Sequence, residues 1–187
     1  MAMLLQASQD LTPALILISA AMCLAHKLGI HDRSVSAHLD PVERSQHARV
    51  FWLVYIVGKD LSLRAEQPSI QLDDDIDPEL PSSLSVFDGD GDGDADAGTV
   101  ITADGNAKMN YSLARVQLGN FQGCIFDHLH PARSSKRSLT DRSITKESIV
   151  HALKKWRASV PPEFNAAVVT TTTGNNPTAV VFFCALH

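Results

Sequence analysis

An acidic run with the spacing of a calcium-binding loop lies near the middle of the chain. Residues 88–98 read DGDGDGDADAG, which places Asp88, Asp90 and Asp92 at the first, third and fifth positions of a helix–loop–helix calcium site. The twelfth position of such a loop supplies a bidentate glutamate, but this chain has Thr99 there. The preceding LPSSLSVF begins with a helix-breaking proline step. We therefore interpret the run as a flexible acidic loop, and its three aspartates as weak calcium candidates; no metal site is predicted.

Two further segments carry residue types that bind metals or catalyse reactions. Cys124 and His128 are four residues apart, on one face of a helix, but two ligands are too few for a closed zinc site. His31 and Asp32 resemble half of a catalytic dyad, yet the sequence has no nucleophile elbow and no phosphate-cradling glycine loop. We therefore expect no catalytic residues, no cofactor in this chain and no enzyme activity.

Composition indicates one globular domain. The chain has 187 residues, of which 44% are hydrophobic and 20% charged, and its formal net charge of −5 argues against a free-standing nucleic-acid binder. Cys23, Cys124 and Cys184 are far apart with mainly apolar neighbours, which predicts buried reduced thiols. The apolar stretch over 14–25 is too short for a bilayer and follows no basic segment, so we predict neither a transmembrane segment nor a signal peptide.

Two helices are predicted in the first third of the chain. Thr12-Pro13 has the form of a helix start, and Gly29 that of a helix stop. Asp40-Pro41 begins a second helix, which carries the apolar run VFWLVYIV over 50–57. Such a run also suits a buried strand, but the cap favours a helix. Buried core is the commoner role for the aromatic side chains in this run.

The rest of the chain alternates loops with two further helical segments. Prolines and the acidic run predict loop structure over 66–107, and helical spacing returns over 108–129. Its expected apolar stripe is Ala114, Leu118, Phe121, Ile125 and Leu129. A basic linker is expected over 134–143, followed by a short helix capped by Thr145 with Ile149, Leu153 and Trp156 on one stripe. The predicted fold is all-α, an irregular multi-helix domain with a long acidic loop and an incomplete C-terminus.

Four segments occur in an order typical of one known family. They read AAMCLAHKLGIHD, ERSQHARVFWLVYIVGKDLSL, AEQPSIQLDDDIDPELP and LKKWRASVP. This order resembles the fungal-specific transcription factor regulatory domain, the middle homology region of zinc-cluster regulators. The likeness runs from about 11 to 164 and is strongest over 25–81. The matching positions, for which a structural role is expected, are Leu28, Gly29, His31, Glu43, Arg49, Phe51, Trp52, Tyr55, Ser62, Leu63, Pro68, Asp75, Ile76, Leu80, Pro81, Trp156 and Pro161.

The chain departs from the family pattern at three places. The usual arginine pair is diluted to Gln46-His47-Ala48-Arg49, an aspartate–arginine step has become Gly58-Lys59, and a glycine–arginine step has become Glu66-Gln67. These changes predict that internal ion pairs have been lost.

The resemblance implies a helical regulatory domain over 1–165, with a flexible acidic loop at 82–107 and a truncated or poorly ordered tail at 166–187. The family's DNA-binding module needs six clustered cysteines around two zinc ions, whereas this chain has three scattered ones. Zinc is therefore expected only in a missing N-terminal cluster, and no direct DNA contact is expected from this chain.

By resemblance, the expected function is transcriptional regulation in the nucleus through other protein domains or a small effector, with no membrane contact. Two alternatives remain at this point: an acidic-loop calcium-binding module, and a non-functional truncated remnant.

Overall fold

A computed structural model describes residues 10–77, 98–102, 105–129 and 138–164 of the chain. Within those ranges the main elements are α-helices, which confirms the predicted all-α class. The helices are α2 (Thr12–Leu28), α3 (Pro41–Arg64), α4 (Tyr111–Leu129) and α6 (Leu139–Ser159). Three short 3-10 helices connect or follow them, η1 (Val35–His38), η2 (Asp73–Asp75) and η4 (Pro162–Phe164). None of the helices in the described ranges has the length and hydropathy needed to cross a membrane.

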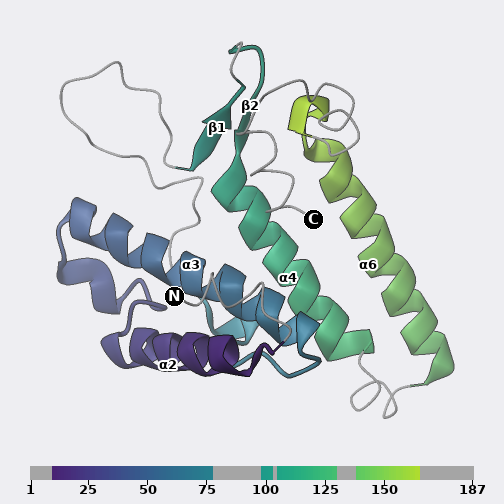
Figure 1. Ribbon diagram of the computed structural model, residues 1–187, viewed down its shortest axis with the longest axis horizontal. Coiled ribbons are helices and arrows are strands. Elements are labelled where there is room, and N and C mark those ends of the chain that lie inside the picture. The colour runs from purple at the N-terminus through teal and green to yellow at the C-terminus, as the bar shows by residue number, and fades with distance from the viewer. Residues whose placement is uncertain (1–9, 78–97, 103–104, 130–137, 165–187) are drawn as a thin grey trace.

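The long helix α3 lies at the centre of the arrangement (Figure 1). It packs against α2 on one side and α4 on the other, and α4 packs in turn against α6. A helix with two packed sides buries a wide face, and in the run over 50–57 Phe51, Trp52, Tyr55 and Val57 are buried whereas Val50 and Leu53 are exposed. The helix interpretation of that run is therefore confirmed.

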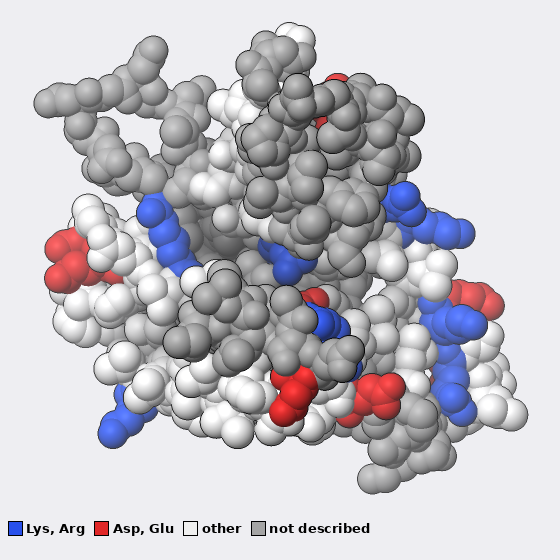
Figure 2. Space-filling model, in the orientation of Figure 1, with Lys and Arg blue, Asp and Glu red and all other residues white. Residues whose placement is uncertain are grey.

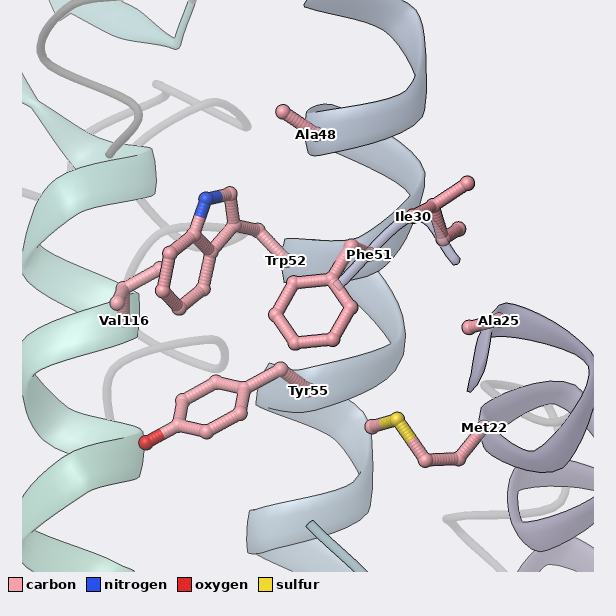
Figure 3. Close-up of a cluster of buried hydrophobic side chains, with 8 residues drawn as sticks. All are labelled: Met22, Ala25, Ile30, Ala48, Phe51, Trp52, Tyr55 and Val116. Atoms are coloured by element: carbon pink, nitrogen blue, oxygen red, sulfur yellow. The ribbon is translucent and has the colours of Figure 1, made fainter. Parts of the chain in front are cut away.

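The aromatic side chains of α3 form the main core cluster (Figure 3). Phe51, Trp52 and Tyr55 are 0%, 6% and 2% exposed, which confirms that they are core residues. Trp52 and Tyr55 point toward α4, whereas Met22 reaches the cluster from α2. The Trp52 ring meets the Phe51 and Tyr55 rings edge to face with centroids 5.3 Å apart, the geometry that aromatic quadrupoles favour. Val116 of α4 completes this side of the cluster.

The ends of α2 and α3 follow the predicted signals with one exception. Asp40 Oδ1 accepts a hydrogen bond from the Glu43 amide (2.9 Å), and Gly29 ends α2 with a φ of 72°. Both predictions are confirmed. The prediction that Thr12 caps α2 is wrong, because Thr12 is already helical and its own amide donates to Asp10 Oδ1 (2.9 Å).

A small hairpin precedes α4, where the sequence predicted loop and then helix. Strands β1 (Thr99–Ile101) and β2 (Lys108–Asn110) pair antiparallel, with Val100 opposite Met109. Met109 belongs to a buried cluster with Ala114 and Phe164, and this packing stabilises the extended conformation of the strand. Asn110 Oδ1 then accepts from the Leu113 amide (2.8 Å), so the helix begins at Tyr111 and the predicted start at 108 is wrong.

Helix α6 begins earlier than predicted. Ser138 Oγ accepts from the Asp141 amide (3.0 Å) and caps the helix, so the predicted linker through 143 and the predicted cap at Thr145 are wrong. The serine and the aspartate three residues later form a start signal that lies inside the basic segment. Ile149, Leu153 and Trp156 are half-buried and share one face, as predicted.

Several predicted features lie outside the described residues. These are the acidic run with Asp88, Asp90 and Asp92, the signature residues Leu80 and Pro81, Cys184, and the segment 166–187. The calcium interpretation therefore stays a prediction. Among the described cysteines, Cys124 is half-buried, whereas Cys23 is exposed on α2, so the prediction of a buried thiol is wrong for Cys23.

Two glycines provide a matched test of the turn that ends α2. Gly29 and Gly105 both have left-handed φ values, 72° and 71°, but a methyl group at Gly29 would lie 2.5 Å from Val35 Cγ1, whereas the space around Gly105 is open to 4 Å. Gly29→Ala should lower the free energy of unfolding by about 2–3 kcal/mol, and Gly105→Ala by about 1 kcal/mol, in urea denaturation. Equal losses would show that the contact with Val35 does not constrain the turn.

Candidate functional site

A buried lysine lies at the centre of the candidate site. Lys59 is on the same inward face of α3 as Trp52 and Tyr55, and its side chain is 2% exposed. Its Nζ forms an ion pair with Asp73 Oδ1 (2.9 Å), donates to the Gln71 carbonyl oxygen (2.9 Å) and lies 5.3 Å from the centroid of the Tyr55 ring. The loss of the family's own ion pairs stays a prediction, but Lys59, at one of the positions that depart from the family pattern, makes a buried ion pair within this chain.

Asp73 connects three elements. It belongs to η2, and besides the ion pair its Oδ1 accepts from the Tyr55 hydroxyl of α3 (2.8 Å). Its Oδ2 accepts from Asn120 Nδ2 of α4 (3.2 Å). Hydrogen bonds to an ionised carboxylate are about twice as strong as neutral ones, so this single side chain ties the segment after α3 to both neighbouring helices.

The polar cluster continues to α2 through Gln71. This side chain is 2% exposed; its Nε2 donates to the Leu72 carbonyl oxygen (2.6 Å), and its Oε1 lies 2.5 Å from His26 Nε2. We call Lys59, Asp73, Tyr55, Asn120, Gln71 and His26 the polar cluster. It spans α2, α3, η2 and α4.

Two glycines let α4 come close to this cluster. A methyl group at Gly119 would lie 3.1 Å from Tyr55 Cε1, and one at Gly123 would lie 2.8 Å from Lys59 Nζ. The glycines are four residues apart and therefore on one helical face. The most buried positions of α4 are Ala114, Val116, Gly119, Gly123 and Phe126. The stripe predicted from apolar spacing runs from the buried Ala114 through four half-buried side chains, Leu118, Phe121, Ile125 and Leu129. It did not include the two glycines that meet α3.

A cavity of about 580 Å³ lies beside the polar cluster, between α3, α4 and α6. Four aromatic side chains contribute to its wall, Trp52 and Tyr55 from α3, Phe121 from α4 and Trp156 from α6. The Phe121 and Trp156 rings meet edge to face with centroids 6.4 Å apart. The remaining lining residues are Asp73, Ile76, Val116, Gln117, Asn120, Ala152, Lys155 and Ser159. Its size and mostly apolar wall are those of small-molecule sites.

A second cleft, of about 530 Å³, contains the predicted signature residue His31. The rings of His31 and His26 lie 4.8 Å apart, edge to face. Asp32 also lines the cleft, but its Oδ1 accepts from the Ser34 amide (2.7 Å), and the hydrogen bonds from Ser34 lower the pKa of Asp32. Asp32 therefore closes a local turn. This geometry gives no support to a His–Asp dyad.

The candidate metal ligands do not form a site with the residues described. Burial raises the pKa of the Cys124 thiol, which disfavours the thiolate that metals bind, and the sulfur lies 3.9 Å from Asn120 Oδ1. No group of three His, Cys, Asp or Glu residues comes together within the described ranges. Cys23 is exposed on α2.

The signature residues fall into three structural groups. Phe51, Trp52, Tyr55 and Ser62 are buried, and Ile76 packs against the aromatic cluster. Gly29, His31, Leu63, Pro68, Asp75 and Pro161 lie at helix ends or turns, and Trp156 is in the cavity wall. Leu28, Glu43 and Arg49 are exposed.

One departure from the family pattern coincides with an unusual backbone angle. Glu66, where the pattern has glycine, has a φ of 54° and is the one non-glycine residue with positive φ in the described ranges. A left-handed conformation suits glycine far better than glutamate.

Sequence reasoning missed five members of the polar cluster, namely Lys59, Asp73, Gln71, Asn120 and His26. One signal was present in α3. Trp52, Tyr55, Lys59 and Ser62 are spaced three, four and three apart, which places a lysine on the inward face of the helix.

Comparisons with known proteins agree with one another. Residues 1–158 match the family described as Fungal specific transcription factor domain. An ABC-transporter-regulating transcription factor from Aspergillus oryzae is 32% identical over 164 residues, which are 88% of this chain and 17% of that protein; its Aspergillus fumigatus counterpart gives the same values. The fusaridione A cluster transcription factor of Fusarium heterosporum is 26% identical over 80% of this chain and 26% of that protein. No solved structure gives a significant match.

The two tyrosines of the chain predict its behaviour in alkali. Burial raises the pKa of both Tyr55 and Tyr111, and the nearby Asp73 carboxylate raises that of Tyr55 further. A folded-state pKa above the unfolded value of about 10 means that stability is fully present below pH 10 and is lost as the pH rises beyond it. Phenolate absorbance should therefore appear above pH 10 together with the loss of helical circular dichroism. Reversible ionisation of both tyrosines near pH 10 in a folded chain would contradict this.

Proposed function

Because this chain belongs to the fungal-specific transcription factor domain family, we propose that it is the regulatory domain of a transcription factor and acts in the nucleus through another protein domain or a small effector. The family match carries the proposal, since it covers α2, α3, α4 and nearly all of α6. Those helices include the ones that form the 580 Å³ cavity. The chain covers 17% of the length of its Aspergillus relatives. Its place in a whole transcription factor is therefore itself a proposal.

We assign the regulatory role to helix packing. Helix α3 is packed on both sides, and the polar cluster ties η2 to α4, so these elements form one unit. Helix α6 packs against α4, and none of its residues reaches full burial in the described structure. A helix held by so little buried surface is an element whose position a ligand or partner domain can shift at small energetic cost.

We assign neither DNA contact nor catalysis to this chain. Its formal net charge is −5, and three cysteines cannot supply a six-cysteine zinc cluster. In such a protein, DNA reading would belong to another region. The absence of a dyad geometry at His31 and Asp32 within the described cleft supports the view that the histidine belongs to a turn.

A reporter assay tests the regulatory role. The chain is inserted between an unrelated DNA-binding domain and an activation domain in a fungal host, and reporter output is measured at equal protein levels. The wild-type insert should change the output relative to an insert carrying Phe51→Asp, which places a charge at a position that is 0% exposed and prevents folding. Lys154→Gln, an exposed change on α6, should behave like the wild type. Identical output from wild type and Phe51→Asp would contradict the proposal.

A further inference from the structure

The cavity between α3, α4 and α6 has walls suited to a flat molecule. Rings from all three helices face it, and its volume of about 580 Å³ accommodates a ligand of two or three fused or linked rings. Aromatic side chains bind planar apolar molecules through stacked and edge-to-face contacts. The wall therefore favours an aromatic or otherwise planar ligand over a sugar or a flexible polar chain.

The carboxylate in the wall does not recruit a cation. Asp73 is paired with Lys59 at 2.9 Å and accepts further hydrogen bonds from Tyr55 and Asn120. Its charge is thus already compensated within the protein. A cationic ligand would gain little from this carboxylate and would still lose its own hydration.

The groups on the α6 side favour an anion instead. Lys155 lines the cavity and is exposed, and it forms no ion pair with any residue in the described ranges. The Trp156 indole nitrogen is buried and finds no acceptor among the described residues, so Lys155 is the donor on this side that a ligand can reach. Helix α6 carries five Lys or Arg residues against two acidic ones, and Lys and Arg side chains line that edge of the molecule (Figure 2). An anionic group at this side of the cavity meets the Lys155 ammonium and the positive potential of α6.

We propose that this cavity binds a small planar, mainly apolar molecule that carries one anionic group, with its rings among the four aromatic side chains and its anion at Lys155. This inference rests on the proposed regulatory function and names the ligand class for it. Because Ala152, Lys155, Trp156 and Ser159 of α6 form one wall, a bound ligand adds contacts to the helix that has no fully buried residue in the described structure. The ligand therefore fixes α6 against α4.

Titration of the full chain with three naphthalene probes tests this assignment. The probes are naphthoate, the neutral naphthalenemethanol and the cationic naphthylmethylamine, which share one ring system and differ in charge. Both tryptophans of the chain, Trp52 and Trp156, line the cavity, so both indole N–H signals in NMR spectra report on it. Both signals should shift saturably with naphthoate, which should bind about five- to tenfold more tightly than the alcohol, and the amine should bind weakest.

Variants separate the cavity from non-specific binding. Lys155→Gln should abolish the preference for naphthoate over the alcohol, whereas Lys154→Gln, a neighbouring exposed lysine outside the cavity, should leave it unchanged. Ala152→Phe should fill the space and abolish binding of all three probes. Naphthoate should also slow amide hydrogen exchange in α6 more than in α2.

Three results would overturn the assignment: no saturable shift of the indole signals, equal binding of anion and cation, or naphthoate binding that survives Lys155→Gln unchanged. The reporter assay contains no naphthoate. If the wild-type insert changes reporter output but the chain binds none of the probes, the ligand class alone is refuted. If the chain binds naphthoate but the insert leaves reporter output unchanged, the regulatory function alone is refuted.

Discussion

The ion pair between Lys59 and Asp73 constrains the structure more than any other single contact. An ammonium group that is 2% exposed has lost nearly all its hydration, which costs several kcal/mol unless charge and hydrogen bonds replace the water. Asp73 and the Gln71 carbonyl oxygen supply that replacement, both at 2.9 Å. The segment after α3 folds back along α3, and this placement leaves the lysine both buried and paired.

The remaining packing follows from this requirement. With Asp73 held in place, its second oxygen faces α4 and accepts from Asn120, while Tyr55 donates to the first. Gly119 and Gly123 permit this approach, because a side chain at either position would press on Tyr55 or Lys59. The same arrangement sets the floor of the aromatic cavity. Helix α6 lines the far side of the cavity with a half-buried face, so the polar cluster and a helix without a fully buried residue in the described structure meet there.

Much of this fold could be predicted from local signals, and the failures have physical causes. Asp40 and Gly29 mark helix ends through contacts within a few residues, which sequence displays directly. The role of Lys59 depends on the carboxylate of Asp73, fourteen residues further along the chain and beyond the end of its helix, so local sequence signals do not reveal this ion pair. The hairpin before α4 has three-residue strands, which are too short to show a periodicity, and Met109 of its second strand belongs to a buried cluster with Phe164, far away in the sequence. Where α4 approaches Tyr55 and Lys59, its inward face consists of Gly119 and Gly123, and a search for hydrophobic spacing does not detect glycines.

A double-mutant cycle on the ion pair tests this account most directly. Lys59→Met and Asp73→Asn should each lower the free energy of unfolding by about 2–4 kcal/mol, because each leaves its buried partner uncompensated. The double variant should lose at least about 1 kcal/mol less than the sum of the two. The longer pair of Arg64 and Asp60, 3.8 Å apart with side chains 43% and 23% exposed, provides the control, and Arg64→Gln with Asp60→Asn should show coupling below about 0.5 kcal/mol. If the losses at Lys59 and Asp73 add up, with a coupling energy no larger than that of Arg64 and Asp60, the central role of this contact is contradicted.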